Sequence, residues 1–568
     1  TMNMKIYILA ASLTAFASCS FLDVEPTVMT GTTYASEEEA LYGLAGVYGV
    51  INNEAFYGNY YSQMLSNVDD LCYYNRTSGN NFSVWYQHNA SSSEIYEAWT
   101  EIYQGIGNAN TFMEAMENSE FDPGHKLYSE ARFLRAYYYF ILAQAWGDVP
   151  LRLTSTTSPY YVQCEATPQL QILQWVVSEM EACLDHAEES LANAPSRVVK
   201  TTMWGILARV YLFMAGESIT GTDDAMKKEY YGKVVEYAGK VMGSGKHRLN
   251  LGNATNDGYS QMFINMIADV YDTEYYESMW EADFKGNRSS SDNWSNGRIG
   301  NVIGLQCQLT DGFSDPDLEC NFSYGQYNGS LKLWNLYWTE DRTDAEIRLA
   351  DDDDPHWDRR QAWNMCPYNY QGKDSEGIER GRKTYYGKTA DDPTDSKAVR
   401  NCGKYRRETR YEGIRGSSNG YTPLNYPILR YADILLMYAE AYNECNGPDS
   451  EVFENCILPI RDRAGISTRP FDGNYDTKET FRQLVRNERG RELVFESLRK
   501  YDLIRWGIFV EEMKKYTEDT YSGEWASGST EAAAARIIAA SVQPRHILLP
   551  IPNIELGVNE ALRQNPLW

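Results

Sequence analysis

Residues 130–140 read Glu130-Ala131-Arg132-Phe133-Leu134-Arg135-Ala136-Tyr137-Tyr138-Tyr139-Phe140, and the segment runs on to Gly147-Asp148-Val149-Pro150-Leu151. A helix over about 125–146 is predicted here, because a turn at Phe121-Asp122-Pro123-Gly124 precedes it and Gly147 follows it. Helical periodicity continues on both sides of this segment. We therefore expect a mainly α-helical protein.

Amphipathic helices are predicted before and after this segment. The first begins after Glu37-Glu38-Glu39, with Leu41, Leu44, Tyr48 and Ile51 on one face. The others are predicted at about 94–117, 168–192, 198–217, 229–243, 429–446, 450–463 and 477–498. Their short connections predict antiparallel hairpins that stack as a tetratricopeptide-like superhelix, although no strict sequence repeat is visible.

The pattern changes between about 250 and 425, where Gly, Asn, Ser, Asp and aromatic residues dominate. No sustained helix is predicted there, only short strands such as Ser278-Met279-Trp280-Glu281-Ala282. A long loop-rich insertion is either disordered or functional, and the aromatic content argues against disorder. We expect one domain over 19–568, with a helical scaffold at about 37–249 and 426–510 and a ligand-binding insertion at about 250–425.

Composition narrows the classes of partner. The chain has 52 Lys and Arg against 79 Asp and Glu, a net charge of −27, which would repel nucleic acid. The 44 Tyr and 14 Trp are more than a core requires. Both residues combine an apolar body with a polar tip, which suits a half-exposed surface that binds sugars.

The N-terminus has the features of an export signal. Met4-Lys5 is followed by an apolar run from Ile6 to Ala17 that is too short to span a bilayer. Phe16-Ala17-Ser18-Cys19 resembles a bacterial lipobox, with Phe16 in place of the usual leucine. We expect a signal peptide at 1–18 and lipidation at Cys19, which would anchor the protein on a membrane without crossing it.

Neither catalytic nor transition-metal chemistry is predicted. The six histidines are scattered without HExxH spacing, and the nine cysteines after Cys19 show no CxxC pair. A structural calcium ion is compatible with the acidic residues Asp311, Asp315, Asp317 and Glu319 or with Asp351 to Asp354, but neither set has EF-hand spacing. A solvated loop is the simpler interpretation of both.

Several segments, together spanning nearly the whole mature chain, resemble signatures of the SusD/RagB family. They are Cys19-Ser20-Phe21-Leu22-Asp23-Val24-Glu25-Pro26, the 130–151 segment quoted above, Leu429 to Ala441, Ile460 to Gly465, Glu488 to Glu496, Tyr501 to Gly507, Leu549 to Pro552 and Gln564 to Pro566. The resemblance implies a tetratricopeptide-like scaffold, a lipoprotein exposed on the outer membrane, and a SusC-like TonB-dependent transporter as partner in oligosaccharide import. The charged residues of 488–499 are spaced for ion pairs along one helix, which indicates a structural role.

The candidate ligand-binding residues lie in polar, loop-like sequence, where exposed rings stack on sugar C–H faces and neighbouring polar groups bind hydroxyls. They are Trp85, Tyr86, Tyr73, Arg76, Trp294, Trp334 and Trp338. Ordinary packing is an equally good interpretation of any one of them.

A basic stretch from Arg380 to Arg415 departs from the overall acidity, with eleven Lys and Arg against five Asp and Glu. It includes Lys404, Arg406, Arg407 and Arg410. We favour internal pairing with the acidic run Asp351 to Asp354, and the alternative is recognition of an anionic glycan.

The function predicted from these features is capture of oligosaccharide at the cell surface and delivery to a transporter, without catalysis. Two alternatives stay open. One is a surface-anchored enzyme of polysaccharide breakdown, and the other is a peptide-capturing member of the same family.

Overall fold

The structure is a computed structural model of the whole chain. It describes residues 33–79, 82–119, 125–156, 162–191, 195–284, 297–307, 320–338, 357–371, 381–384, 400–412, 420–466, 474–521 and 530–568. The predicted signal peptide, Cys19 and Trp294 lie outside these residues. So do both acidic runs considered for calcium.

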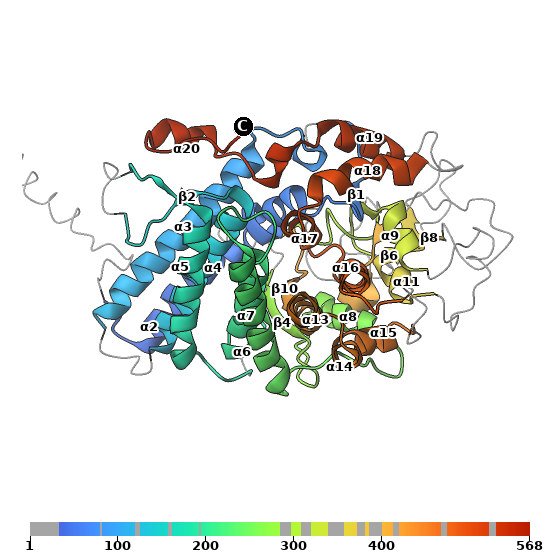
Figure 1. Cartoon of the computed structure of the whole chain (residues 1–568), viewed down its shortest axis with the longest axis horizontal. Helices are drawn as coiled ribbons and strands as arrows, with labels where there is room; N and C mark the ends of the chain where they lie inside the picture. The colour runs from blue at the N-terminus through green and yellow to red at the C-terminus, as the bar shows by residue number, and fades with distance from the viewer. Residues whose placement is uncertain are drawn as a thin grey trace, which may run out of the picture.

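Stacked helices make up the first half of the protein. They are α2 (Glu37–Tyr48), α3 (Ser93–Glu117), α4 (Lys126–Trp146), α5 (Gln169–Cys183), α6 (Lys200–Met214) and α7 (Asp224–Gly243). Each packs on the next along the chain, so that α2 to α7 form one continuous layer in the left half of Figure 1. The predicted mainly helical, tetratricopeptide-like fold is confirmed. Most helix bounds lie close to those expected, but the helix predicted at 168–192 already ends at Cys183.

The stack continues across the insertion. Helix α13 (Tyr431–Asn446) packs directly on α7, and α16 (Lys478–Leu493) packs on α13. Two antiparallel strands join the ends of the insertion, because β4 (Ser278–Ala282) pairs with β10 (Tyr426–Arg430). The predicted strand at 278–282 is therefore present. Its pairing brings the chain back to the helical stack.

The insertion is built on a small sheet and short helices. Its sheet has the order β1-β5-β9-β6, from β1 (Cys72–Tyr74), β5 (Tyr327–Gly329), β9 (Asn401–Cys402) and β6 (Met365–Cys366). The other elements of the insertion are α8 (Gly258–Ala268), α9 (Leu331–Leu336), α11 (Arg360–Asn364), α12 (Thr409–Glu412), and the strand pair β7 (Tyr368–Gln371) with β8 (Gly381–Thr384). A further strand pair, β2 (Val149–Pro150) with β3 (Ala166–Thr167), lies between α4 and α5 of the helical stack. The absence of a sustained helix was predicted wrongly, since α8 has 11 residues. Its signal is Asp257, whose carboxylate caps the helix by accepting from the Ser260 N–H at 3.0 Å.

The scaffold also extends past the expected limit at residue 510. The C-terminal helices are α14 (Ser450–Val452), α15 (Leu458–Arg463), α17 (Arg499–Arg505), α18 (Phe509–Tyr521), α19 (Thr530–Ser541) and α20 (Asn553–Val558). Helices α18 to α20 lie across the top of Figure 1. The Asn565 amide donates to the backbone oxygens of Trp146 and Leu549, each at 2.7 Å, so the chain end is fixed to the end of α4.

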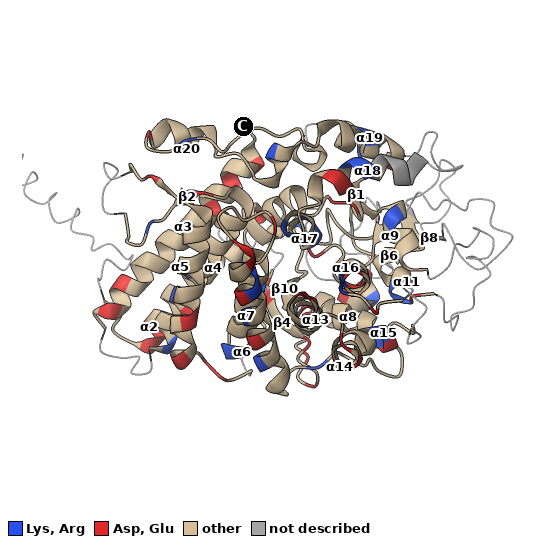
Figure 2. Cartoon of the chain, in the orientation of Figure 1, with Lys and Arg blue, Asp and Glu red and all other residues tan. Residues whose placement is uncertain are grey.

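A buried network of charged side chains joins α13 and α16 to their neighbours. Glu492 contacts three guanidinium groups, those of Arg360 at 2.8 Å, Arg430 at 3.1 Å and Arg463 at 2.6 Å. Figure 2 marks the charged residues of α16 and of the elements around it. These ion pairs connect different elements, whereas we expected them along one helix. A network this fully paired and buried holds segments together and is closed to ligands.

Candidate functional site

Most of the rings predicted to contact ligand are buried. The exposed fractions are 3% for Trp85 and Tyr86, 1% for Tyr73, 2% for Trp334 and 9% for Trp338. The prediction that these rings are exposed is therefore wrong. Polar loop sequence surrounds them, but the loops fold onto the sheet and the helical stack and cover them.

The buried rings form a support below the surface. Phe82 is 45% exposed, and its ring centre lies 6.4 Å from that of Trp85. Trp85 packs edge-on against Tyr74 at 6.5 Å, and Tyr74 against Tyr327 at 5.3 Å. This row of T-shaped contacts ties the exposed Phe82 to strands β1 and β5. Trp85 is thus a core residue beneath an exposed ring.

Arg76 is the predicted ligand residue that the structure leaves exposed. Its guanidinium carbon lies 5.0 Å from the centre of the Tyr324 ring, which is half-buried. Phe322 is also half-buried and packs edge-on against Tyr324 at 4.8 Å. The two rings precede β5 at alternate positions, so they project from the same side of an extended chain. Cation–π contact holds the arginine over Tyr324.

A second group of polar and aromatic side chains adjoins this one. Arg298 pairs with Glu54 at 3.5 Å and donates to the Asn301 side chain at 3.2 Å. The backbone oxygen of Asn301 in turn accepts from the Tyr324 N–H at 2.7 Å, which connects the two groups. Tyr421 donates to Glu54 at 3.1 Å. The two groups, linked through the Asn301 backbone, together contain rings, guanidinium groups and a carboxylate.

We call Arg76, Phe322, Tyr324, Arg298, Glu54 and Tyr421 the ring surface. Half-buried aromatic faces stack on sugar C–H groups, while guanidinium and carboxylate groups bind hydroxyls. Of its members, the sequence predicted Arg76. Phe322 and Tyr324 could also have been predicted, because they alternate just before a strand. Glu54, Arg298 and Tyr421 join the surface only through contacts between segments distant in the sequence.

The four cations singled out in the basic stretch are paired internally, as favoured, with Glu408, Glu412 and Glu496; the acidic run Asp351 to Asp354 lies outside the described residues. Lys404 pairs with Glu496 at 2.6 Å, and Arg407 with Glu412 at 2.9 Å. Arg406 pairs with Glu408 at 3.2 Å. The side chains of these three cations are at most 4% exposed, so they are closed to an anionic glycan. Arg410 pairs with Glu408 at 3.0 Å, but its side chain is 55% exposed.

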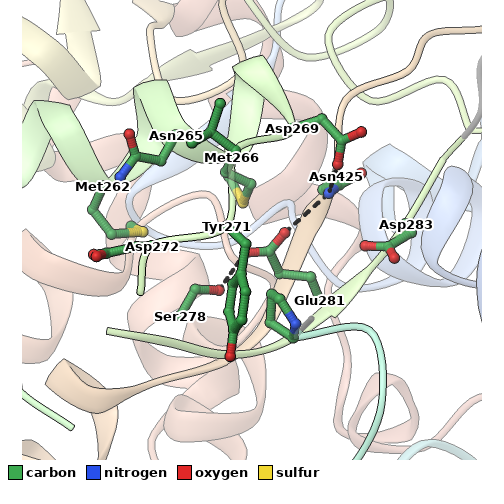
Figure 3. Close-up of a pocket in the computed structure, with 12 residues that line it drawn as sticks. Met262, Asn265, Met266, Asp269, Tyr271, Asp272, Ser278, Glu281, Asp283 and Asn425 are labelled. Carbon is green, nitrogen blue, oxygen red and sulfur yellow. Dashed lines mark hydrogen bonds between the residues drawn. The ribbon is translucent and has the colours of Figure 1, made fainter. Parts of the chain in front are cut away.

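A separate cavity of about 120 Å³ lies between α8, β4 and the start of β10. Met262, Met266 and Tyr271 supply apolar walls. Figure 3 shows Ser278 and Asn425 hydrogen-bonded to Glu281, and the Asn425 amide is 3.1 Å from the carboxylate. Ligand pockets usually measure about 300–1,000 Å³, so this cavity is too small for an oligosaccharide.

Two carboxyl groups that line the cavity have raised pKa values. Burial, together with the neighbouring Asp283 carboxylate, raises the pKa of Glu281 to about 7. Burial also raises the pKa of Asp283 to about 6. Near neutral pH both carboxyl groups are therefore partly protonated. Protonation removes negative charge from a site where none of the described Lys or Arg side chains forms an ion pair with Glu281.

Two kinds of site are absent from the part of the chain that the structure describes. No group of three or more His, Cys, Asp or Glu side chains there is arranged to hold a metal ion. None of the described helices combines the length and apolar character that a membrane span needs.

Comparison with known families accounts for nearly the whole chain. The family described as "SusD family" matches residues 276–568, and the family described as "Starch-binding associating with outer membrane" matches residues 20–212. SusD-like protein P25 of Formosa agariphila is 22% identical, over 99% of this chain and 98% of its own length.

Solved structures share the fold. A SusD homolog from Bacteroides thetaiotaomicron superposes with a TM-score of 0.76 at 24% identity, covering 95% of this chain and 98% of the homolog. A laminarin-binding SusD-like protein superposes with a TM-score of 0.64 at 19% identity, covering 94% of this chain and all of the other. At these identities the likeness establishes the fold and leaves the ligand open.

Proposed function

The chain belongs to the SusD family, and from that premise we propose that it binds oligosaccharide at the cell surface through the ring surface. The observation that carries the proposal is the half-buried pair Phe322 and Tyr324, with the exposed Arg76 over Tyr324. The names of its relatives support the class of ligand, since one family is described as starch-binding and one similar structure as laminarin-binding.

The ring surface suits a neutral glycan, because its exposed cation, Arg76, lies over the Tyr324 ring and can bind hydroxyls. Arg298 is already paired with Glu54, and Lys404, Arg406 and Arg407 are buried in internal pairs. Stacking and neutral hydrogen bonds depend little on ionic strength, because they are not screened as ion pairs are. We propose that the protein binds without cleaving its ligand and passes it to a SusC-like TonB-dependent transporter.

The proposal includes an outer-membrane location. Cys19 would carry the lipid anchor after removal of residues 1–18, and residues 19–568 would act as one unit. Two sequence features support the anchor, the short apolar run before Cys19 and the lipobox-like Phe16-Ala17-Ser18-Cys19.

The test measures affinity for a panel of neutral glucans, acidic glycans and peptides, in the wild type and in the variants Arg76→Ala and Tyr324→Ala. Each substitution removes one contact from the centre of the ring surface. Each should lower glucan affinity by about 1–3 kcal/mol, or roughly 5- to 150-fold, while the thermal midpoint stays within about 2 °C. Raising the salt concentration should change the wild-type affinity little.

Two controls separate binding from folding. Tyr42→Ala removes a tyrosine that is 69% exposed on α2 and should leave affinity unchanged. Trp85→Ala empties a core position and should destabilise the protein by about 3–5 kcal/mol. Unchanged affinity in both ring-surface variants, or tighter binding of peptides than of glucans, would contradict the proposal. New reducing ends appearing in the glucan incubations would instead support the enzyme alternative.

A further inference from the structure

Two cysteine side chains lie against each other beneath the ring surface. Cys307 and Cys320 are both fully buried, in a small apolar cluster that also contains Leu305 and Tyr370. The Cys307 thiol donates to the backbone oxygen of Cys320 at 3.3 Å, and the two thiols are hydrogen-bond partners. The residues are 13 positions apart in the chain, so this contact is tertiary.

Backbone pairing fixes both cysteines in place. Cys307 and Ser323 exchange both of their N–H···O bonds, each at 2.9 Å. Cys320 forms a β-bridge with Glu408, and the following Asn321 N–H donates to the Arg407 oxygen at 2.8 Å. Backbone pairing therefore holds the two thiols in contact with each other.

We propose that Cys307 and Cys320 are a redox modification site, which an oxidising environment converts to a disulfide. The two thiols release two protons and two electrons, and one S–S bond forms. A small-molecule disulfide such as oxidised glutathione accepts the electrons: its S–S bond breaks and it leaves as two thiols. The reaction passes through a mixed disulfide on one cysteine, which the other cysteine then resolves.

Burial controls when this reaction occurs. It raises the pKa of the Cys320 thiol well above its usual range, and contact with Cys307 raises it further. Thiolate, the reactive form, is scarce in the folded protein. The cross-link is therefore expected to form while the chain folds in an oxidising compartment, and slowly or not at all once the thiols are covered.

Cys366 belongs to the same buried cluster, whereas three other cysteines are placed less favourably. Cys72 and Cys402 lie on β1 and β9, which are separated by β5, so roughly 9–10 Å lies between their strands. A disulfide needs its two Cα atoms within about 7 Å. Cys183 bonds the Glu179 oxygen of its own helix at 3.1 Å and serves as a lone buried control.

The cross-link would act on the ring surface. Phe322 and Tyr324 come two and four residues after Cys320. A bond from Cys320 to Cys307 would therefore tie the start of the segment that carries these rings to the chain at Cys307. This consequence for ligand binding rests on the proposed function. Formation of the bond and local rigidity do not, and the experiment measures those two.

The full chain is exported to the periplasm of a bacterial host, its free thiols are alkylated, and the protein is unfolded, digested and examined by mass spectrometry. We expect one peptide pair joined through Cys307 and Cys320, lighter by two hydrogen masses than the reduced pair. Cys320→Ser should abolish the pair and Cys183→Ser should retain it. Full alkylation of both Cys307 and Cys320, or linkage of either to Cys366, overturns the proposal.

Hydrogen exchange gives the second measurement. The Ser323 N–H donates to Cys307, so reduction of the wild type should speed its exchange by about tenfold, as loss of a short-loop cross-link allows local opening. Cys320→Ser should exchange at the faster rate with or without reductant. Equal rates in oxidised and reduced wild type overturn the proposal that the bond stabilises this segment.

Discussion

Two buried glutamates of this protein avoid an unpaired buried charge in opposite ways. Glu492 in the α16 network is fully buried and Glu281 beside the cavity of Figure 3 is 6% exposed. Burial by itself raises the pKa of Glu492, but attraction by Arg463, Arg430 and Arg360 outweighs it and holds the pKa well below its usual range. Burial, aided by Asp283, raises the pKa of Glu281 to about 7.

The difference shows that the buried charged residues of this fold serve its architecture and do not contact a ligand. Cations surround Glu492, so it stays ionised and links elements distant in the chain. Glu281 is hydrogen-bonded by Ser278 and Asn425 and takes up a proton instead. Neither arrangement offers an open charge to a ligand, in contrast to the exposed Arg76. Charged residues alone therefore do not mark the binding surface.

The largest expected effect is that of Glu492→Gln. It leaves three guanidinium groups without their shared carboxylate and should lower the free energy of unfolding by about 3–5 kcal/mol at pH 7. Because the folded pKa is lowered, the contribution of Glu492 is complete above its unfolded pKa of about 4.3 and declines as the pH falls below it. Urea unfolding at pH 7 and pH 4 measures both. A loss below about 1 kcal/mol at pH 7 would show that the network is dispensable.

The change Glu281→Gln should have the opposite sign. A raised folded pKa means that the stabilising contribution of this group is complete below about pH 4.3 and is lost as the pH rises through about 7. A permanently neutral glutamine avoids that loss. The variant should match the wild type near pH 4 and exceed it by up to about 4 kcal/mol at pH 9. Urea unfolding of the variant and the wild type at the two pH values tests this. A difference in the free energy of unfolding that is the same at both pH values would show that Glu281 is not the titrating group.

The smallest effect is expected at an exposed pair. Glu236 on α7 lies 2.9 Å from Lys233 and 2.6 Å from Lys240, and all three side chains are about two-fifths exposed. Glu236→Gln should cost about 0.5 kcal/mol or less, and 0.5 M salt should erase the difference. Urea unfolding with and without salt measures it. A cost comparable with that of Glu492→Gln would end the distinction between buried and exposed networks.

Local sequence patterns predicted the helical stack well. The helix expected at 125–146 spans Lys126–Trp146, and the helix expected at 94–117 spans Ser93–Glu117. These elements are fixed by periodicity and by turn residues at their ends. The same rules missed α8, because the prediction followed the loop-like composition around it and overlooked the Asp257 cap.

The binding surface was harder to predict, since it depends on which rings the fold covers. Trp85 and Phe82 stand in the same short segment, yet Trp85 is buried and Phe82 exposed. Long-range contacts made the difference, such as the packing of Trp85 on Tyr74 and of Tyr74 on Tyr327. Composition identified an aromatic protein. It could not say which rings face outward.

The attachment of the chain end to α4 has a consequence for biogenesis. The Trp146 indole donates to the oxygen of Pro550 across 404 positions, and Arg499 pairs with Asp70 across 429. Contacts of such separation form only after nearly all of the chain is available, and they make folding slow. Until then the early helices lack their final cover. A chain whose last residues are not yet available therefore stays incompletely folded.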